Sequence, residues 1–260
     1  MSATQLDAIL KKEQKLIQKQ DNILKAKTGP QIDKVIDKIK EKIPAKLMQG
    51  LEVAFFNGFK LIFEKGSGVI EKTYDKKMIC EDYEINHYAV TNHPSKRRFR
   101  NMDKTAGKNQ TINAAATTAI GTGLGLLGIG LPDIPVFISI LLRQLYQTAL
   151  SYGFDYESDE EKVYILSLIR TAIADNAQRE ELHEQVSLLA RDLNQGVKIS
   201  YVMDTELHET ATMLAEAMLT AKFIQGIPIV GAVGGITNNV MINKISKYAK
   251  LQYKKRYLLL

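Results

Sequence analysis

The chain has 260 residues, of which 45% are hydrophobic and 25% are charged, and its formal net charge is +6. These proportions are those of an ordinary globular protein, and the length allows one large domain or two small ones. The single cysteine, Cys80, excludes a disulfide within the chain, which fits a reducing compartment. The first residues lack the apolar run of a signal peptide, so we expect a cytoplasmic protein.

The net charge is spread unevenly along the chain. Residues 1–108 hold 22 Lys and Arg against 14 Asp and Glu, a net of +8, whereas residues 109–242 hold 7 against 15, a net of −8. The last segment, 243–260, holds 6 basic residues and no acidic one. Basic segments attract polyanions such as anionic lipid surfaces. The alternative is that both basic ends pair with the acidic middle of the same chain.

The first 44 residues predict a helical arm made of two amphipathic stretches. Gly29-Pro30 interrupts the first stretch, and Pro44 closes the second. We therefore expect an N-terminal arm over residues 1–44 and a helical domain over residues 45–260. The apolar side chains that recur at helical spacing in the arm are Leu6, Ile9, Leu10, Leu16, Ile17, Ile23 and Leu24, then Ile32, Val35, Ile36, Ile39 and Ile43.

The helical domain begins with an apolar stretch at 47–63, followed by mixed polar residues at 75–108 that favour no single element. An uncharged stretch follows at 109–132. Residues 133–153 then predict a helix, with Asp133 as its N-cap and Gly153 just after its last turn. Its polar side chains form one narrow strip, so we expect this helix to be central and largely buried; they are Ser139, Arg143, Gln144, Gln147 and Ser151.

Three more helices are predicted after the central one. The sequence SDEE at 158–161 is a capping box that opens the first, Gly196 stops the second, and Asp204 or Thr205 caps the third. An alternation of apolar residues over 197–201 predicts one short strand. The three apolar stripes are Val163, Leu166, Ile169 and Ile173; Leu182, Val186, Leu189 and Leu193; and Leu207, Ala211, Leu214, Met218 and Ala221.

A glycine-rich stretch at 121–130 reads GTGLGLLGIG, and within it GLGLLG matches the G-x-G-x-x-G pattern of a dinucleotide-binding loop. Such a loop needs a strand before it, a helix directly after it and an acidic residue about 20 positions further on. Here small residues precede the glycines, LPDIP interrupts a following helix, and the acidic residues Asp133 and Asp155 stand too early and too late. We therefore expect no nucleotide cofactor.

Two glycine pairs with a spacing of four, Gly121/Gly125 and Gly231/Gly235, favour close packing of helices instead. The first segment contains Asn, Gln and several Thr, so its hydrophobicity is modest for a membrane span. A buried core element is the expected structure. The alternative is a protein that inserts two helical hairpins, 112–131 and 226–242, into a membrane.

Three stretches resemble the EcsC family of bacterial proteins: GLGLLGIGLPDIPVFISILLRQLYQTALSYGFD, SDEEKVYILSLI and QGIPIVGAVGGITNNVMINKISKYAKLQYKKRYLLL. The resemblance covers most of the chain from about residue 45, and its most specific part is GLPDIP with LLRQLYQTALSYGFD. The namesake of the family is encoded with the two components of an ABC transporter, so the resemblance implies an association with a transporter. It implies no catalytic residue, although a hydrolase label attaches to some relatives.

A metal-dependent hydrolase is therefore an alternative function. The chain contains no G-x-S-x-G, S-x-x-K or H-E-x-x-H motif. The sequence ELHE occurs twice, and a carboxylate beside a histidine on a helix can form part of a metal site. Two solvated helix N-termini rich in acidic residues explain the same pattern. The candidate metal ligands are His183, Glu184, His208 and Glu209.

Two basic clusters are candidates for contact with phosphate groups. The densest reads KRRFR at 96–100, and the second lies in the C-terminal tail, where tyrosines accompany the basic residues. Aromatic and basic side chains together suit a lipid headgroup interface. The residues expected to contact phosphates are Lys96, Arg97, Arg98, Arg100, Lys254, Lys255 and Arg256.

Together these patterns predict an all-α fold, a compact multi-helix domain in which glycine-rich segments pack helices. The expected function is that of a non-enzymatic cytoplasmic protein that needs no cofactor. It would dock reversibly on an anionic membrane surface or on a membrane protein. Nucleic acid is not the expected partner, and the oligomeric state stays open.

Overall fold

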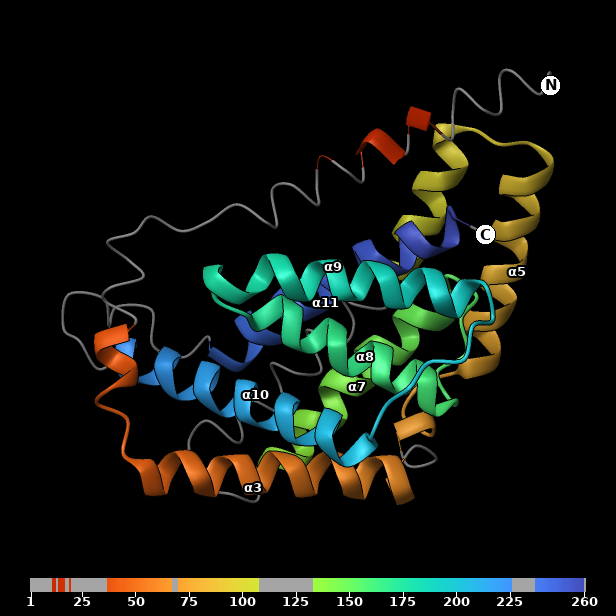
Figure 1. Cartoon of the computed structure of the whole chain (residues 1–260). Coiled ribbons are helices and arrows are strands. Elements are labelled where there is room, and N and C mark those ends of the chain that lie inside the picture. Colours follow the sequence, from red (N-terminus) through yellow and green to blue (C-terminus); the bar gives the residue numbers. More distant parts are fainter. Residues whose placement is uncertain are drawn as a thin grey trace.

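The computed structural model describes residues 11, 12, 14–16, 19, 37–66, 70–107, 133–225 and 237–259. Within these ranges the chain forms helices and loops and no strand (Figure 1), which confirms the predicted all-α class. The predicted arm, 1–44, lies mostly outside the described residues. The elements are α3 (Ala45–Leu61), the π-helical turn η1 (Ile62–Gly66), α5 (Lys76–Asn92), α7 (Asp133–Ser151), α8 (Asp159–Ile173), α9 (Asn176–Asn194), α10 (Met203–Gln225) and α11 (Thr237–Tyr257), with a further helix at 96–107.

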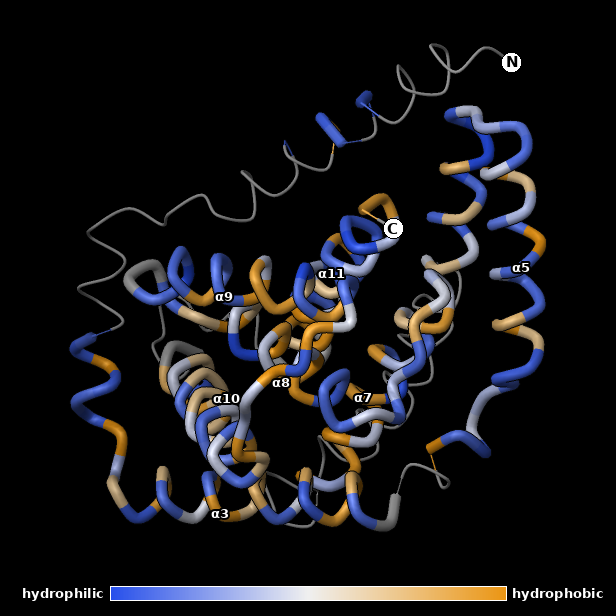
Figure 2. Tube along the Cα trace, turned by 45° about the vertical axis from the view of Figure 1, so that its right-hand side comes forward, coloured by the Kyte–Doolittle hydropathy of each residue, from blue (hydrophilic) through white to orange (hydrophobic). Residues whose placement is uncertain are grey.

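The core lies between α7, α8 and the helices packed around them. α8 packs against α9, α10 and α11, while α7 packs against α3, α5 and α11. Figure 1 shows α3 along the lower edge of the molecule below α10, and α5 along one side. Figure 2 shows that hydrophilic residues dominate the outer sides of α5 and α9. The helix at 96–107 returns beside α5, so these two form a hairpin that rises to the end of the molecule opposite α3.

α7 is the buried central helix that its sequence predicts. Every residue from Gln144 to Tyr152 is buried, and this includes most of the predicted polar strip. Hydrogen bonds offset part of the cost of this burial, although Gln144 Nε2 is buried without a hydrogen-bond partner. The hydroxyls of Thr148 and Ser151 donate to backbone carbonyls one turn earlier, each at 2.7 Å, and Ser246 of α11 donates to Gln144 Oε1. The buried part of this polar strip therefore does not face water, and at Gln144 it contacts α11.

Three predicted helix ends are confirmed. Ser158 Oγ accepts the N–H of Glu161 at 3.1 Å, which caps α8. Gly153 and Gly196 have φ values of 82° and 67°, a left-handed conformation that glycine adopts without strain. Behind each glycine the chain makes the paired hydrogen bonds of a Schellman motif, as in Phe154 N–H to Ala149 O at 3.0 Å. Two predicted N-caps are displaced by one or two residues: α7 begins at Asp133 itself, and α10 begins at Met203, so Asp204 lies inside its first turn.

Two expectations for the polar regions are corrected. The strand predicted over 197–201 is wrong, because these residues belong to the loop between α9 and α10. Val197 and Val202 are 48% and 65% exposed, and a lone strand without a partner cannot pair its backbone groups. The mixed region 75–108, which favoured no element, forms α5 and the helix at 96–107.

Close packing at a glycine does occur, at a position the sequence did not single out. Gly58 on α3 lies against Ile134 and Ile138 of α7, where an added Cβ would contact both side chains. The pairs Gly121/Gly125 and Gly231/Gly235, for which this packing is predicted, lie outside the described residues. The same holds for the predicted hairpin at 112–131 and for most of the one at 226–242.

Candidate functional site

The first basic cluster lies at the turn of the hairpin formed by α5 and the helix at 96–107. Lys96, Arg97, Arg100 and Lys104 are exposed there, and we call these four residues the basic tip. Arg98 differs from them because its Nη1 donates to Ala89 O at 2.9 Å and to His93 O at 2.7 Å. The guanidinium of Arg98 thus fastens the start of the helix to the end of α5, while Lys96, Arg97 and Arg100 are exposed.

The second cluster occupies the last turn of α11, where cations interact favourably with the helix dipole. Lys254 Nζ lies 2.7 Å from Asp103 Oδ2, and Lys250 Nζ donates to Asp103 O at 2.6 Å. Tyr152 Oη donates to Asp103 Oδ1 at 3.0 Å. Asp103 therefore joins α7, α11 and the helix at 96–107, so both predicted basic segments belong to one region of the molecule.

Arg256 has a different environment from the other predicted cations. It is 3% exposed, and its Nη1 lies 2.8 and 2.9 Å from the two carboxylate oxygens of Glu161. Its Nε donates to Asn194 Oδ1 at 3.0 Å, and its guanidinium lies 4.2 Å from the ring centre of Phe154 and 4.5 Å from that of Tyr164. The expectation that Arg256 contacts phosphates is therefore corrected, because all of its charge faces the interior.

Sequence reasoning missed Glu161 as the partner of Arg256. In a capping box the glutamate returns to the N-cap residue, but the carboxylate of Glu161 turns inward instead. It accepts a hydrogen bond from Tyr253 Oη at 2.7 Å beside the pair with Arg256. Burial raises the pKa of the Glu161 carboxyl, and the charge of Arg256 opposes that shift. The spacing along α11 carried a signal, since Ile242, Ile245, Ala249, Tyr253 and Arg256 recur on its buried face.

Other ion pairs connect the basic N-terminal part of the chain with its acidic middle, as the alternative interpretation of the charge pattern expected. Lys40 Nζ lies 3.1 Å from Asp175 and 2.7 Å from Glu216, and Lys60 lies 3.6 Å from Asp204. These contacts join the first part of the chain to α10 and to Asp175 in the loop before α9, and they partly neutralise its positive charge. The basic tip is the densest group of cations that the structure leaves exposed among the predicted ones.

The four candidate metal ligands do not form a cluster. His183 on α9 is buried, and its Nδ1 lies 2.8 Å from Tyr248 Oη. His208 on α10 is exposed and stacks on Phe56 with ring centres 4.0 Å apart. Glu184 is exposed on α9, and Glu209 lies 3.5 Å from Arg170. In the part of the chain that the structure describes, no three His, Cys, Asp or Glu side chains gather where one metal ion could bind.

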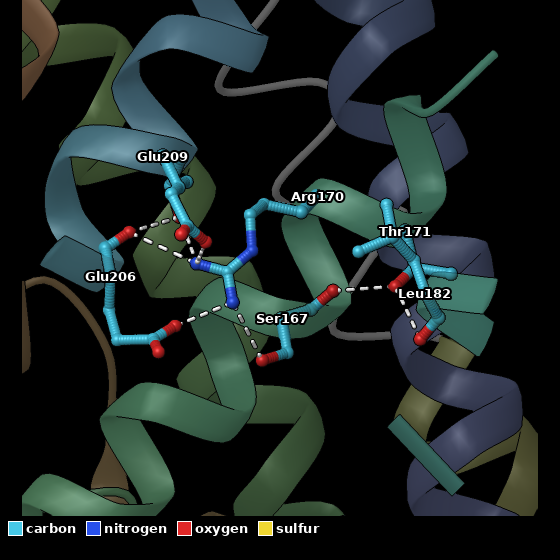
Figure 3. Close-up of polar contacts among 7 residues, drawn as sticks. Ser167, Arg170, Thr171, Leu182, Glu206 and Glu209 are labelled. Carbon is cyan, nitrogen blue, oxygen red and sulfur yellow. Dashed lines mark hydrogen bonds and ion pairs between the residues drawn. The ribbon is translucent and has the colours of Figure 1, made fainter. Parts of the chain in front are cut away.

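Arg170 organises a polar network between α8 and α10 (Figure 3). Its Nη2 pairs with Glu206 Oε2 and contacts Ser167 Oγ at 3.2 Å, while its Nη1 donates to Glu206 O at 3.1 Å. The next residue of α8, Thr171, donates to Ser167 O one turn earlier at 2.8 Å. The network connects α8 to α10. Because Glu206 and Glu209 are already paired with Arg170, we infer that the network stabilises the fold.

A second network connects residues 70–76 to α7 and the loop before α8. Tyr74 Oη lies 2.7 Å from Tyr156 Oη, which donates to Glu71 Oε1 at 2.6 Å, and the ring of Tyr146 stacks on Tyr156 at 4.0 Å. Burial raises the pKa of Tyr74 to about 12. The phenol therefore keeps its proton at neutral pH, and the network holds segments together without offering a base.

Cys80 on α5 has none of the surroundings of a reactive thiol. It is half-buried, and burial raises the pKa of its thiol, which keeps it protonated and weakly nucleophilic. The neighbouring His87 contacts Tyr257 Oη at 3.0 Å. Neither Cys80 nor Tyr74 is therefore activated as a nucleophile or a base by its surroundings. None of the described helices combines the length and the apolar composition that crossing a bilayer requires.

Comparisons with known proteins agree with the resemblance seen in the sequence. A model of the EcsC protein family matches residues 3–258. Over 162 residues the chain is 27% identical to the uncharacterized protein YdbA of Bacillus subtilis (strain 168), covering 61% of this chain and 58% of YdbA. Over 146 residues it is 26% identical to the protein EcsC of the same organism, covering 55% of this chain and 58% of that relative. No solved structure matches.

Proposed function

The chain belongs to the EcsC protein family, and on that premise we propose that it docks reversibly on anionic lipid bilayers through the basic tip. The observation that carries the proposal is the exposure of Lys96, Arg97, Arg100 and Lys104 at one end of the molecule. Each lysine or arginine near an anionic surface contributes about 1 kcal/mol, so four cations suffice for weak, reversible binding.

The structure around the basic tip supports this proposal in two ways. Arg98 ties the helix at 96–107 to the end of α5, and Asp103 ties it to α11, which holds the neighbouring cations in place. On the adjoining helix α5, Ile85 and Tyr88 are 67% and 69% exposed. Apolar and aromatic side chains next to cations suit the headgroup region, where Tyr commonly lies. The association of the family's namesake with an ABC transporter supports a site at the membrane by analogy only.

Cosedimentation with vesicles tests the proposal. We expect binding to vesicles of phosphatidylcholine mixed with phosphatidylglycerol, no binding to phosphatidylcholine alone, and loss of binding at high salt as the charges are screened. Replacing Lys96, Arg97 and Arg100 together by serine should weaken binding at least about tenfold. The matched control replaces Lys38, Lys42 and Lys198, which are exposed elsewhere, and should change binding by less than about twofold.

Three results would contradict the proposal. Equal binding to both kinds of vesicle would show that charge does not drive the interaction. An equal loss of binding in both triple variants would show that net charge matters and the basic tip does not. No binding to either kind of vesicle would show that the chain does not bind lipid. A membrane protein would then be the expected partner.

A further inference from the structure

We propose that Arg143 of α7 binds a small oxyanion, a group such as phosphate or carboxylate, beside residues 70–76. The side chain of Arg143 is partly exposed, so a small ion can reach it from solvent. Its Nη2 donates to Thr73 O at 2.6 Å, whereas its Nε is buried without a hydrogen-bond partner. A buried donor that stays unsatisfied on a charged group is costly, and it indicates a place for an acceptor from outside the chain.

The positive charge of Arg143 is not balanced by an acidic side chain. Within the described residues no carboxylate forms an ion pair with it. The two fully buried arginines differ from it, because Arg170 and Arg256 each pair with a glutamate. The undescribed segments on either side of this region, 67–69 and 108–132, contain no aspartate or glutamate, so they cannot provide the negative charge.

The carboxylates of the neighbouring tyrosine network are already engaged with other groups. Glu71 accepts the hydrogen bond of Tyr156 Oη at 2.6 Å and lies 3.6 Å from Lys76 Nζ. Glu157 forms an ion pair with the same lysine. Neither carboxylate is therefore left to balance Arg143.

The phenol of Tyr74 does not balance the charge of Arg143 either. Burial raises the pKa of Tyr74 to about 12, so the phenol is neutral at pH 7. Burial also lowers the pKa of the Arg143 guanidinium, but an arginine keeps its proton at neutral pH all the same. An oxyanion would offset the cost of this charge, because a guanidinium donates two parallel N–H bonds to two oxygens of a phosphate or carboxylate.

The site is separate from the basic tip, so this inference does not depend on the proposed function. Thr73 precedes the start of α5, and the basic tip follows its end. A helix of 17 residues is roughly 25 Å long, which exceeds the distance over which salt leaves exposed charges coupled. Arg143→Met should therefore change vesicle binding by less than about twofold.

Thermal unfolding in matched salts tests the site. The wild type and Arg143→Met are compared in sodium chloride, sodium phosphate and sodium acetate at equal pH and ionic strength. At about 50 mM oxyanion, ten times a dissociation constant of about 5 mM, the wild type should gain at least about 3 °C more than Arg143→Met over the chloride value. Comparing the two proteins in each salt removes the general stabilisation that phosphate gives to folded proteins. A gain in phosphate, in acetate or in both identifies the oxyanion that fits.

Two further variants separate the guanidinium from charge in general. Arg143→Lys keeps the charge without the fork of N–H donors, and it should lose most of the gain. The matched control, Arg191→Met, removes an exposed arginine of α9 and should respond to each salt as the wild type does.

The response to the oxyanions decides the inference. Equal gains for the wild type and Arg143→Met in both oxyanions overturn it, whatever their difference in chloride, because Arg143 would then be only a structural contact of Thr73. If Arg143→Met does not fold, Arg143→Lys replaces it in the comparison, and a gain equal to that of the wild type overturns the inference in the same way.

Discussion

Replacing Arg256 by leucine is expected to lower the free energy of unfolding by about 3–5 kcal/mol. The substitution removes the two contacts of 2.8 and 2.9 Å to Glu161 and leaves that carboxylate buried with only the hydroxyl of Tyr253. Arg256 also contributes a hydrogen bond to Asn194 and a close approach to the ring of Phe154. Equilibrium unfolding in urea, followed by circular dichroism, measures the loss.

Two further variants separate the buried pair from general effects of the substitution. Lys255→Leu changes the neighbouring cation, which lies 3.3 Å from Ser187 Oγ, and should cost less than about 1 kcal/mol. Glu161→Leu combined with Arg256→Leu removes both charges and should be less destabilised than Arg256→Leu alone, because no charge is left buried without a partner. If the two variants Arg256→Leu and Lys255→Leu have the same urea midpoint of unfolding, the Glu161–Arg256 pair contributes nothing measurable to stability, and its assignment as a stabilising contact of α11 is wrong.

The contrast between Arg256 and Arg97 shows what a linear pattern can reveal. Both lie in short basic runs, and counting charges treats them alike. The difference arises in three dimensions, because Arg256 continues the buried face of α11 while Arg97 lies on the exposed side of the helix at 96–107. Periodicity along α11 would have separated them. Periodicity would not have identified Glu161 as the partner of Arg256, because Glu161 lies 95 residues away and its place in the capping box already explained it.

Helices with a strong apolar face were predictable, and helices with a weak one were not. α7 and α8 bury most of their side chains, and both their existence and their ends follow from local signals at Ser158 and Gly153. α5 has only Ile79 and Val90 fully buried, so its sequence mixes polar and apolar residues without a clear period. Its structure depends on tertiary contacts, among them the one that Tyr83 makes with Gly153.

Replacing Gly153 by alanine is expected to lower the free energy of unfolding by about 2–5 kcal/mol. Part of this loss, about 1–2 kcal/mol, arises because the left-handed conformation at φ 82° disfavours any side chain. The rest arises because a Cβ at this position would overlap the far end of the half-buried Tyr83 ring on α5, and displacing that ring from its contacts with His87 and Tyr257 costs about 1–3 kcal/mol. Thermal and urea unfolding of the purified variant measure the sum.

Gly196 provides a matched control for the Gly153 substitution. It ends α9 with the same Schellman hydrogen bonds at φ 67°, but a Cβ added there would meet nothing within 4 Å. Gly196→Ala should therefore lose only the backbone part, about 1 kcal/mol. Tyr83→Ala combined with Gly153→Ala should lose less than the two single substitutions added together, because the smaller side chain makes room for the new Cβ. Equal losses for Gly153→Ala and Gly196→Ala would mean that α5 moves aside at no cost. In that case α5, and the basic tip that it helps to place, would be held less firmly than the contacts of Tyr83 indicate.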